Sequence, residues 1–134
     1  MSTPSLTRLV ETCKALSNRG RARVLTVLDG RELCVGQIAA IFDIARSTAS
    51  EHLSELRRVG LVEERREGRF VWFAHATDER ALRILDAVRR EAAADPVALK
   101  DAALAERILG LPHDVVCEKG RTALDGDGVR SRSA

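Results

Sequence analysis

The sequence predicts a mostly α-helical fold with a β-hairpin wing (α+β), the winged helix-turn-helix, and three observations support this. Residues 35–56 contain two short runs of apolar residues at helical spacing, separated by only enough chain for a tight turn. Gly60 follows the second run, and helices commonly end at a glycine. Two strand-like runs, 61–66 and 70–74, lie on either side of Gly68, which suits a hairpin turn.

Further helices are predicted on both sides of this unit from apolar periodicity and capping residues. They run from about 5 to 16, from Asn18 to Gly30, from Asp78 to Asp95 and from about 97 to 109. Residues 1–111 are therefore expected to form one winged-helix DNA-binding and dimerisation domain. Residues 112–134 are rich in Gly, Asp, Arg and Ser, so a largely flexible C-terminal tail is expected there.

Apolar stripes on the N-terminal helix and the last two helices predict a homodimer. The helix-turn-helix, the wing and the helix from Asn18 to Gly30 can bury their own apolar side chains without these three helices. The remaining stripes therefore need a partner, and a second copy of the chain is the simplest one. On the helix that starts at Asp78, Leu82, Leu85 and Val88 form this stripe, while Arg80 is expected on the solvent-facing side. A symmetric dimer also presents two recognition helices about one DNA turn apart, which matches a pseudo-palindromic operator.

Composition restricts the class of protein. The net charge is only +2, so binding to DNA phosphates requires the arginines to be gathered on one face of the molecule, away from the carboxylates. No apolar run reaches the roughly 20 residues of a membrane span, and the N-terminus lacks a signal-peptide pattern, so a cytoplasmic protein without membrane contact is expected. Three cysteines argue against a disulfide framework. No motif of an enzyme is found, so we expect no catalysis and no required cofactor.

The polar face of the second short helix suits the major groove of double-stranded DNA. Arg46 can bind guanine or phosphate, and Ser47, Thr48 and Ser50 are short donors for phosphates or base edges. Glu51 can accept a hydrogen bond from a cytosine amino group, although a solvated glutamate is the commoner outcome. A winged-helix module that binds protein instead of DNA is the alternative from another functional class.

Taken together, these segments resemble the ArsR/SmtB family, the arsenic-repressor type of bacterial winged-helix metalloregulators. The matching segments are KALSNRGRARVLTVL, ELCVGQIAAIFDIARSTASEHLSELRRVGLV and RREGRFVWF, within about residues 14–74. The resemblance implies a homodimeric repressor that binds operator DNA and releases it when a metal ion, metalloid or oxidant binds. It implies DNA contacts from the matching positions Arg46, Ser47, Thr48, Ser50, His52, Arg66 and Arg69. For His52, packing or a dimer hydrogen bond stays equally open.

The effector site departs from the arrangements known in that family. The Cys-Val-Cys run of the arsenic type is Cys34-Val35-Gly36 here, the helix after Asp78 has no histidine for the zinc type, and the recognition helix has no cysteine. The remaining thiols are Cys13, Cys34 and Cys117. Three thiolates could hold As(III) or another soft metal ion, if residues 112–134 fold back across the dimer.

Cys34 is the strongest single candidate, because a helix N-terminus lowers the pKa of a thiol. Cys13 also fits a buried place in an apolar stripe, and Cys117 fits an unpaired surface thiol. A switch based on cysteine oxidation, and no sensing by cysteine at all, therefore stay open beside the metalloid site. His113 is expected to be exposed to solvent rather than to act as a ligand.

Overall fold

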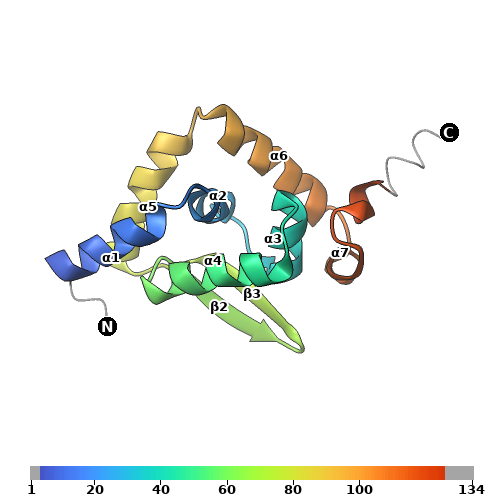
Figure 1. Ribbon diagram of the computed structural model, residues 1–134, viewed down its shortest axis with the longest axis horizontal. Coiled ribbons are helices and arrows are strands. Elements are labelled where there is room, and N and C mark those ends of the chain that lie inside the picture. The colour runs from blue at the N-terminus through green and yellow to red at the C-terminus, as the bar shows by residue number, and fades with distance from the viewer. Residues whose placement is uncertain (1–3, 126–134) are drawn as a thin grey trace.

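The computed structural model describes residues 4–125, which fold into a winged helix-turn-helix with additional helices around it (Figure 1). The elements in chain order are α1 (Leu6–Leu16), α2 (Arg19–Val27), β1 (Leu33–Cys34), α3 (Val35–Phe42), α4 (Arg46–Arg58), β2 (Val62–Glu67), β3 (Phe70–His75), α5 (Glu79–Ala92), α6 (Pro96–Leu109) and α7 (His113–Lys119). Within residues 4–125, no helix is long and apolar enough to cross a membrane. The predicted fold class is confirmed.

Helices α3 and α4 form the helix-turn-helix, as predicted. Asp43 ends α3 in the left-handed conformation at φ 54°, which an aspartate tolerates better than most residues. Ala45 then begins the next helix from an extended conformation. The two helices share one core with α2, and its fully buried side chains include Leu25, Leu28, Ile38, Ile41, Leu53 and Leu56. Burial of this face fixes which side of α4 is left to solvent.

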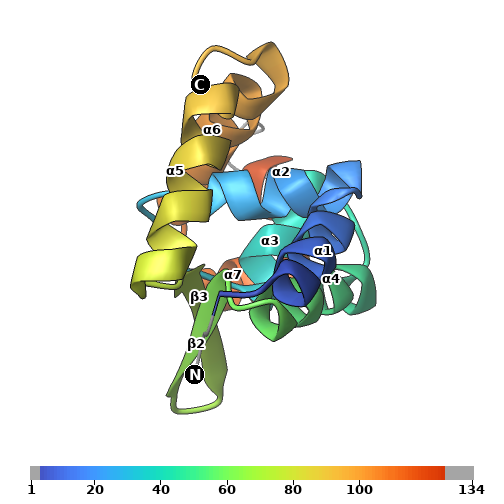
Figure 2. The ribbon, with the colours of Figure 1, turned by 90° about the vertical axis from the view of Figure 1, so that its left-hand side faces the viewer.

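The wing is part of a three-stranded antiparallel sheet in the order β1-β3-β2. Strands β2 and β3 form the predicted hairpin, with Gly68 in its turn at φ 61°, and Figure 2 shows the hairpin projecting away from the helices. Strand β1 was not expected. It has two residues and exists because Leu33 and Cys34 pair with Phe73 and Trp72 of β3, so tertiary contact rather than local propensity makes it a strand.

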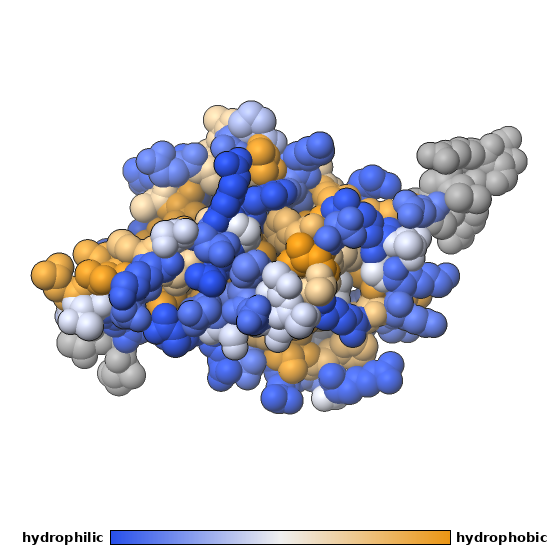
Figure 3. Space-filling model, in the orientation of Figure 1, coloured by the Kyte–Doolittle hydropathy of each residue, from blue (hydrophilic) through white to orange (hydrophobic). Residues whose placement is uncertain are grey.

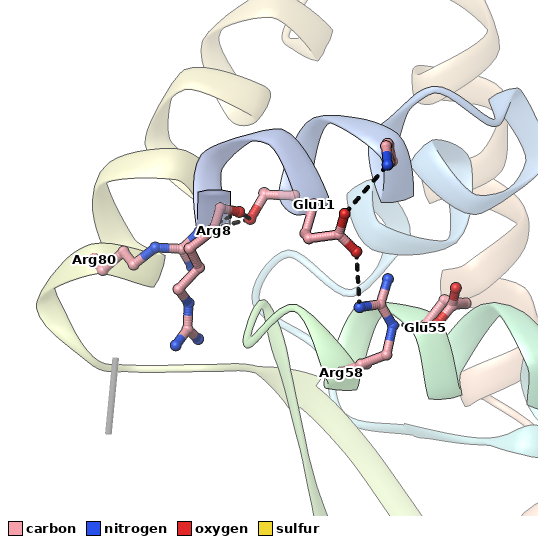
Figure 4. A network of polar contacts seen from close by, with 7 residues as sticks. Arg8, Glu11, Glu55, Arg58 and Arg80 are labelled. Atoms are coloured by element: carbon pink, nitrogen blue, oxygen red, sulfur yellow. Dashed lines mark hydrogen bonds and ion pairs between the residues drawn. The ribbon is translucent and has the colours of Figure 1, made fainter. Parts of the chain in front are cut away.

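Helix α1 is joined to the helix-turn-helix and to α5 by polar contacts. Figure 4 shows Glu11 of α1 facing Arg58 of α4, at 3.2 Å between Oε1 and Nη1. The expectation that Arg80 faces solvent is wrong, because its side chain is buried and its guanidinium donates to the Val59 carbonyl and the Thr12 hydroxyl. Arg80 therefore ties the start of α5 to α1 and to the end of α4.

Apolar side chains remain exposed on α1 and α5. Leu6 is 78% exposed, Leu9 49%, Val10 48% and Leu82 51%, whereas Leu85 of the same α5 stripe is buried. Figure 3 shows apolar atoms gathered at the α1 end of the molecule. A contiguous exposed patch of large apolar residues marks an interaction surface more often than a solvated one.

The predicted flexible tail is wrong for residues 113–125. These residues form α7 and a following helical turn, and they lie beside α3 (Figure 1). Val116 is fully buried, and Ala123 and Leu124 are more than nine-tenths buried in the same core. Apolar burial therefore holds this segment on the domain. Residues 126–134 lie outside the described residues.

Candidate nucleic-acid interface and thiol site

Helix α4 presents a polar face to solvent. Arg46, Ser47, Ser50 and Glu51 are exposed and Thr48 is half-buried, while the opposite face of the helix is in the core. These five predicted residues therefore lie together on one accessible helix face. Short donors with an arginine at the first turn of an accessible helix suit base edges and phosphates in the major groove.

His52 is placed differently from the rest of the predicted set. It is half-buried, and its Nε2 would lie 3.2 Å from a Cβ added at Gly20 of α2. Burial lowers the pKa of His52, which favours the neutral imidazole. The structure thus supports the packing alternative for His52, with Gly20 leaving room for its ring.

The wing arginines divide into paired and accessible ones. Arg65 binds Glu32 at 2.7 Å and Glu67 at 3.1 Å, and these hydrogen bonds raise its pKa. Arg66 and Arg69 are exposed, and the guanidinium of Arg69 stands 5.3 Å from the centre of the Phe70 ring. The two wing arginines predicted to contact DNA, Arg66 and Arg69, are therefore accessible to a phosphate, while Arg65 is held by two carboxylates.

Cys34 and Cys117 form a close thiol pair within one chain. Their sulfur atoms are 3.6 Å apart, with Cys34 at the β1–α3 junction and Cys117 on α7. Gly36 makes this approach possible, because a Cβ there would lie 2.5 Å from the Cys117 sulfur and 3.1 Å from its Cα. The fold thus joins two of the three predicted thiols across 83 residues of sequence.

The expectation of a lowered pKa at Cys34 is wrong. Burial raises the pKa of this thiol to about 11, and the neighbouring Cys117 adds to the increase. Hydrogen bonding to the backbone at the start of α3 acts in the opposite direction but is outweighed. Cys34 is therefore a protonated thiol at neutral pH, and the half-buried Cys117 is the more accessible member of the pair.

Cys13 does not join this pair within one chain. It is exposed on α1, contrary to the alternative that it fills a buried stripe, and α1 and α7 lie at opposite ends of the molecule (Figure 1). Among residues 4–125, no group of three or more His, Cys, Asp or Glu side chains is arranged to hold a metal ion. A single chain consequently brings together two of the three predicted thiols, Cys34 and Cys117.

A groove of about 600 Å³ connects the thiol pair with the DNA-facing arginines. It is lined by Cys34, Val35, Gly36, Arg46, Arg69, Phe70, Val71, Asp114, Cys117 and Glu118. Arg46 donates a hydrogen bond from Nη2 to the Cys117 carbonyl. The thiols and two predicted DNA contacts thus share one cavity wall, which spacing along the sequence could not reveal.

His113 was expected to be exposed to solvent, but it is half-buried. Its ring packs edge-on against Phe70 and Trp72 of the wing, with centroid distances of 4.5 and 5.0 Å. Gly36 and His113 were both missed as positioning residues. For Gly36 the only signal was the glycine in place of the second cysteine of Cys-Val-Cys.

These features define the class of protein: a winged-helix DNA-binding protein with an accessible recognition helix and a thiol pair beside it. Residues 18–64 match the model of the bacterial regulatory proteins of the arsR family. The chain belongs to this family, whose members are transcriptional regulators rather than enzymes.

Individual relatives agree with this assignment. The transcriptional activator HlyU of Vibrio cholerae is 35% identical over 72 residues, which cover 54% of this chain and 67% of HlyU. A putative arsenical resistance operon repressor of Halobacterium salinarum is 33% identical over 87 residues, 63% of this chain and 66% of the relative.

Among solved structures, the homodimeric winged helix-turn-helix domain of a possible ArsR-family regulator from Mycobacterium bovis is similar. It has a TM-score of 0.58 and 32% identity over 69% of this chain and 91% of that one. The chain is accordingly a DNA-binding transcriptional regulator of the ArsR family.

Proposed function

We propose that this protein is a cytoplasmic transcriptional repressor that leaves its operator when a thiol-reactive effector engages Cys34 and Cys117. The observation that carries the proposal is the shared groove, in which the thiol pair lies beside Arg46 and Arg69. An effector held by both sulfur atoms would lie in the groove that Arg46 and Arg69 also line. Chemistry at the thiols can therefore change DNA affinity without a long-range pathway.

The first effector class is arsenite or another soft metal ion, because thiolates are the preferred ligands of soft ions. One arsenite, As(OH)₃, can condense with the two thiols to give a dithiolate with one hydroxyl left on arsenic and two waters released. Since one chain supplies two sulfur atoms, the third position is filled by the effector's own hydroxyl. The kinship to an arsenical resistance repressor supports this class.

Oxidation is the second candidate, and the 3.6 Å between the two sulfur atoms favours it. A peroxide would oxidise the more accessible Cys117 thiol to a sulfenic acid, with water as the product from the peroxide. The Cys34 sulfur then attacks, the S–O bond breaks, a second water leaves and a disulfide forms. The pair needs only a small approach to reach bonding distance.

A homodimer on a pseudo-palindromic operator completes the proposal. The exposed Leu6, Leu9 and Leu82 provide an apolar surface on α1 and α5, and the M. bovis relative is described as homodimeric.

Sedimentation of the Leu9→Asp variant tests this dimer interface directly. We expect its dimer dissociation constant to rise by about tenfold or more, whereas Ser54→Asp on the exposed face of α4 should keep the wild-type mass. An unchanged mass for Leu9→Asp would exclude this interface.

The experiment that tests the function is fluorescence anisotropy of a labelled fragment of the protein's own promoter. Reduced protein should bind it in a salt-dependent manner, and arsenite or peroxide should then be titrated separately. Mass spectrometry of the released protein distinguishes the two chemistries, since an arsenic adduct gains mass and a disulfide loses two hydrogens. Absence of salt-dependent binding would favour the protein-interaction module, and binding that neither effector disturbs would exclude the thiol switch.

A further inference from the structure

The C-terminal residues 113–125, which we call the C-terminal clamp, contact the wing and both helices of the helix-turn-helix, α3 and α4. His113 packs on the wing, Val116 enters the core beside α3, and the Cys117 carbonyl accepts a hydrogen bond from Arg46 of α4. Arg121 donates to the carbonyls of Ala40 and Ile41 at the end of α3. A short segment thus joins α3, α4 and the wing.

The contact with Arg121 has a specific structural effect. The last carbonyls of a helix have no partner within the helix, and here a guanidinium supplies one. Arg121 Nε lies 3.0 Å from the Ala40 carbonyl, immediately before the turn that leads to α4. The clamp is therefore anchored at both ends of α3, by Cys117 against Gly36 at the start and by Arg121 at the end.

The docked clamp opposes DNA binding in two ways. Arg46 Nη2 is engaged by the Cys117 carbonyl, so while the clamp is docked this donor is taken from a phosphate or a guanine. Asp114 and Glu118 line the same groove as Arg46 and Arg69, which places two carboxylates where DNA phosphates would approach. Like charges at an interface cost binding free energy, so clamp and DNA compete for one surface.

We infer that the C-terminal clamp is an autoinhibitory element that competes with operator DNA for Arg46, and that a bond between Cys34 and Cys117 holds it in the docked position. This inference rests on the proposed function for its effector step. With free thiols, the clamp exchanges between docked and undocked states, and DNA selects the undocked state. A covalent or metalloid bridge removes the undocked state, and the operator is released.

The test for the docked state uses the full chain with Arg121→Ala, which keeps both cysteines and Arg46. Because the variant weakens docking, reduced Arg121→Ala should bind the promoter fragment about fivefold more tightly than the wild type. Arg107→Ala, which removes one exposed arginine of α6, is the charge-matched control and should match the wild type. Wild-type or weaker affinity of a folded Arg121→Ala, checked by circular dichroism, would overturn the inference.

A second measurement needs no variant and no effector. If the clamp and DNA exclude each other, DNA must loosen the clamp by the same factor by which the clamp weakens DNA binding. Hydrogen exchange of amides in residues 116–120 of the reduced wild type should therefore accelerate about fivefold when operator DNA is added. Unchanged or slower exchange would overturn the inference. Failure of arsenite and peroxide to release DNA would reject the proposed function and the effector step that rests on it, but not the competition between clamp and DNA, because this experiment uses neither effector.

Discussion

Arg46, the first residue of α4, donates a hydrogen bond to the carbonyl of Cys117 on α7. This contact connects the residue best suited to DNA with the residue best placed to meet an effector. Cys117 in turn lies 3.6 Å from Cys34, sulfur to sulfur. The thiol pair is therefore linked to the recognition helix directly, through the Arg46 side chain.

Arg46 should be a strong contributor to operator binding. Replacing it with alanine removes a guanidinium at the start of the recognition helix, and we expect a loss of about 1–3 kcal/mol in binding free energy. The loss should be measured by anisotropy at fixed salt, with Arg107→Ala as the control for a lost positive charge. Equal affinities for wild type and Arg46→Ala would remove Arg46 from the interface.

The two kinds of wing arginine should differ in their salt dependence. Arg66 is exposed, whereas Arg65 is held by Glu32 and Glu67. Arg66→Gln should reduce the slope of log K against log salt by about one, because one phosphate contact is lost. Arg65→Gln should leave the slope close to that of the wild type. The reverse pattern would show that the ion pairs of Arg65 open on DNA and that Arg66 stays in solvent.

Gly36→Ala should displace α7. The added Cβ would stand 2.5 Å from the Cys117 sulfur, so either α3 or α7 must move. We expect the free energy of unfolding in urea to fall by about 1–3 kcal/mol, as for other overpacked sites. Gly110→Ala is the matched control, since its nearest neighbour would be 3.4 Å away. Stability equal to that of the wild type would mean that α7 is not closely docked at Gly36.

The raised pKa of Cys34 should appear in its reactivity. Its ordinary value is 9.0 and burial raises it to about 11, so the thiolate fraction is small at neutral pH. Peptide-resolved alkylation of Cys34 should accelerate up to about pH 11 instead of levelling near pH 9. Since the folded pKa is above the unfolded one, the associated stabilisation is complete below pH 9.0 and is lost as pH rises toward 11. A plateau below pH 9 would contradict this burial.

The helix-turn-helix and wing were predictable because apolar spacing, a terminating glycine and a hairpin glycine all point to the same fold. The polar face of α4 followed from the same periodicity. Arg80 was misplaced because a long side chain can enter the core and reach buried carbonyls, which a helical wheel does not represent.

The C-terminal clamp was not predictable in the same way. Helix α7 has only seven residues, too few for a clear periodic signal, and tertiary burial of Val116 rather than intrinsic propensity stabilises it. The pKa of Cys34 was misjudged for a related reason. A helix N-terminus lowers a thiol pKa only when the sulfur remains solvated, and α7 buries it.

The central claim is that Cys34 and Cys117 together control DNA binding, and one comparison tests it most directly. Reduced wild type, Cys117→Ser and Cys13→Ser should each be bound to labelled promoter DNA, then titrated with arsenite and, separately, with peroxide. We predict that wild type and Cys13→Ser release DNA with at least one of the two effectors, and that Cys117→Ser remains bound with both. Release of Cys117→Ser at the wild-type effector concentration would contradict the account.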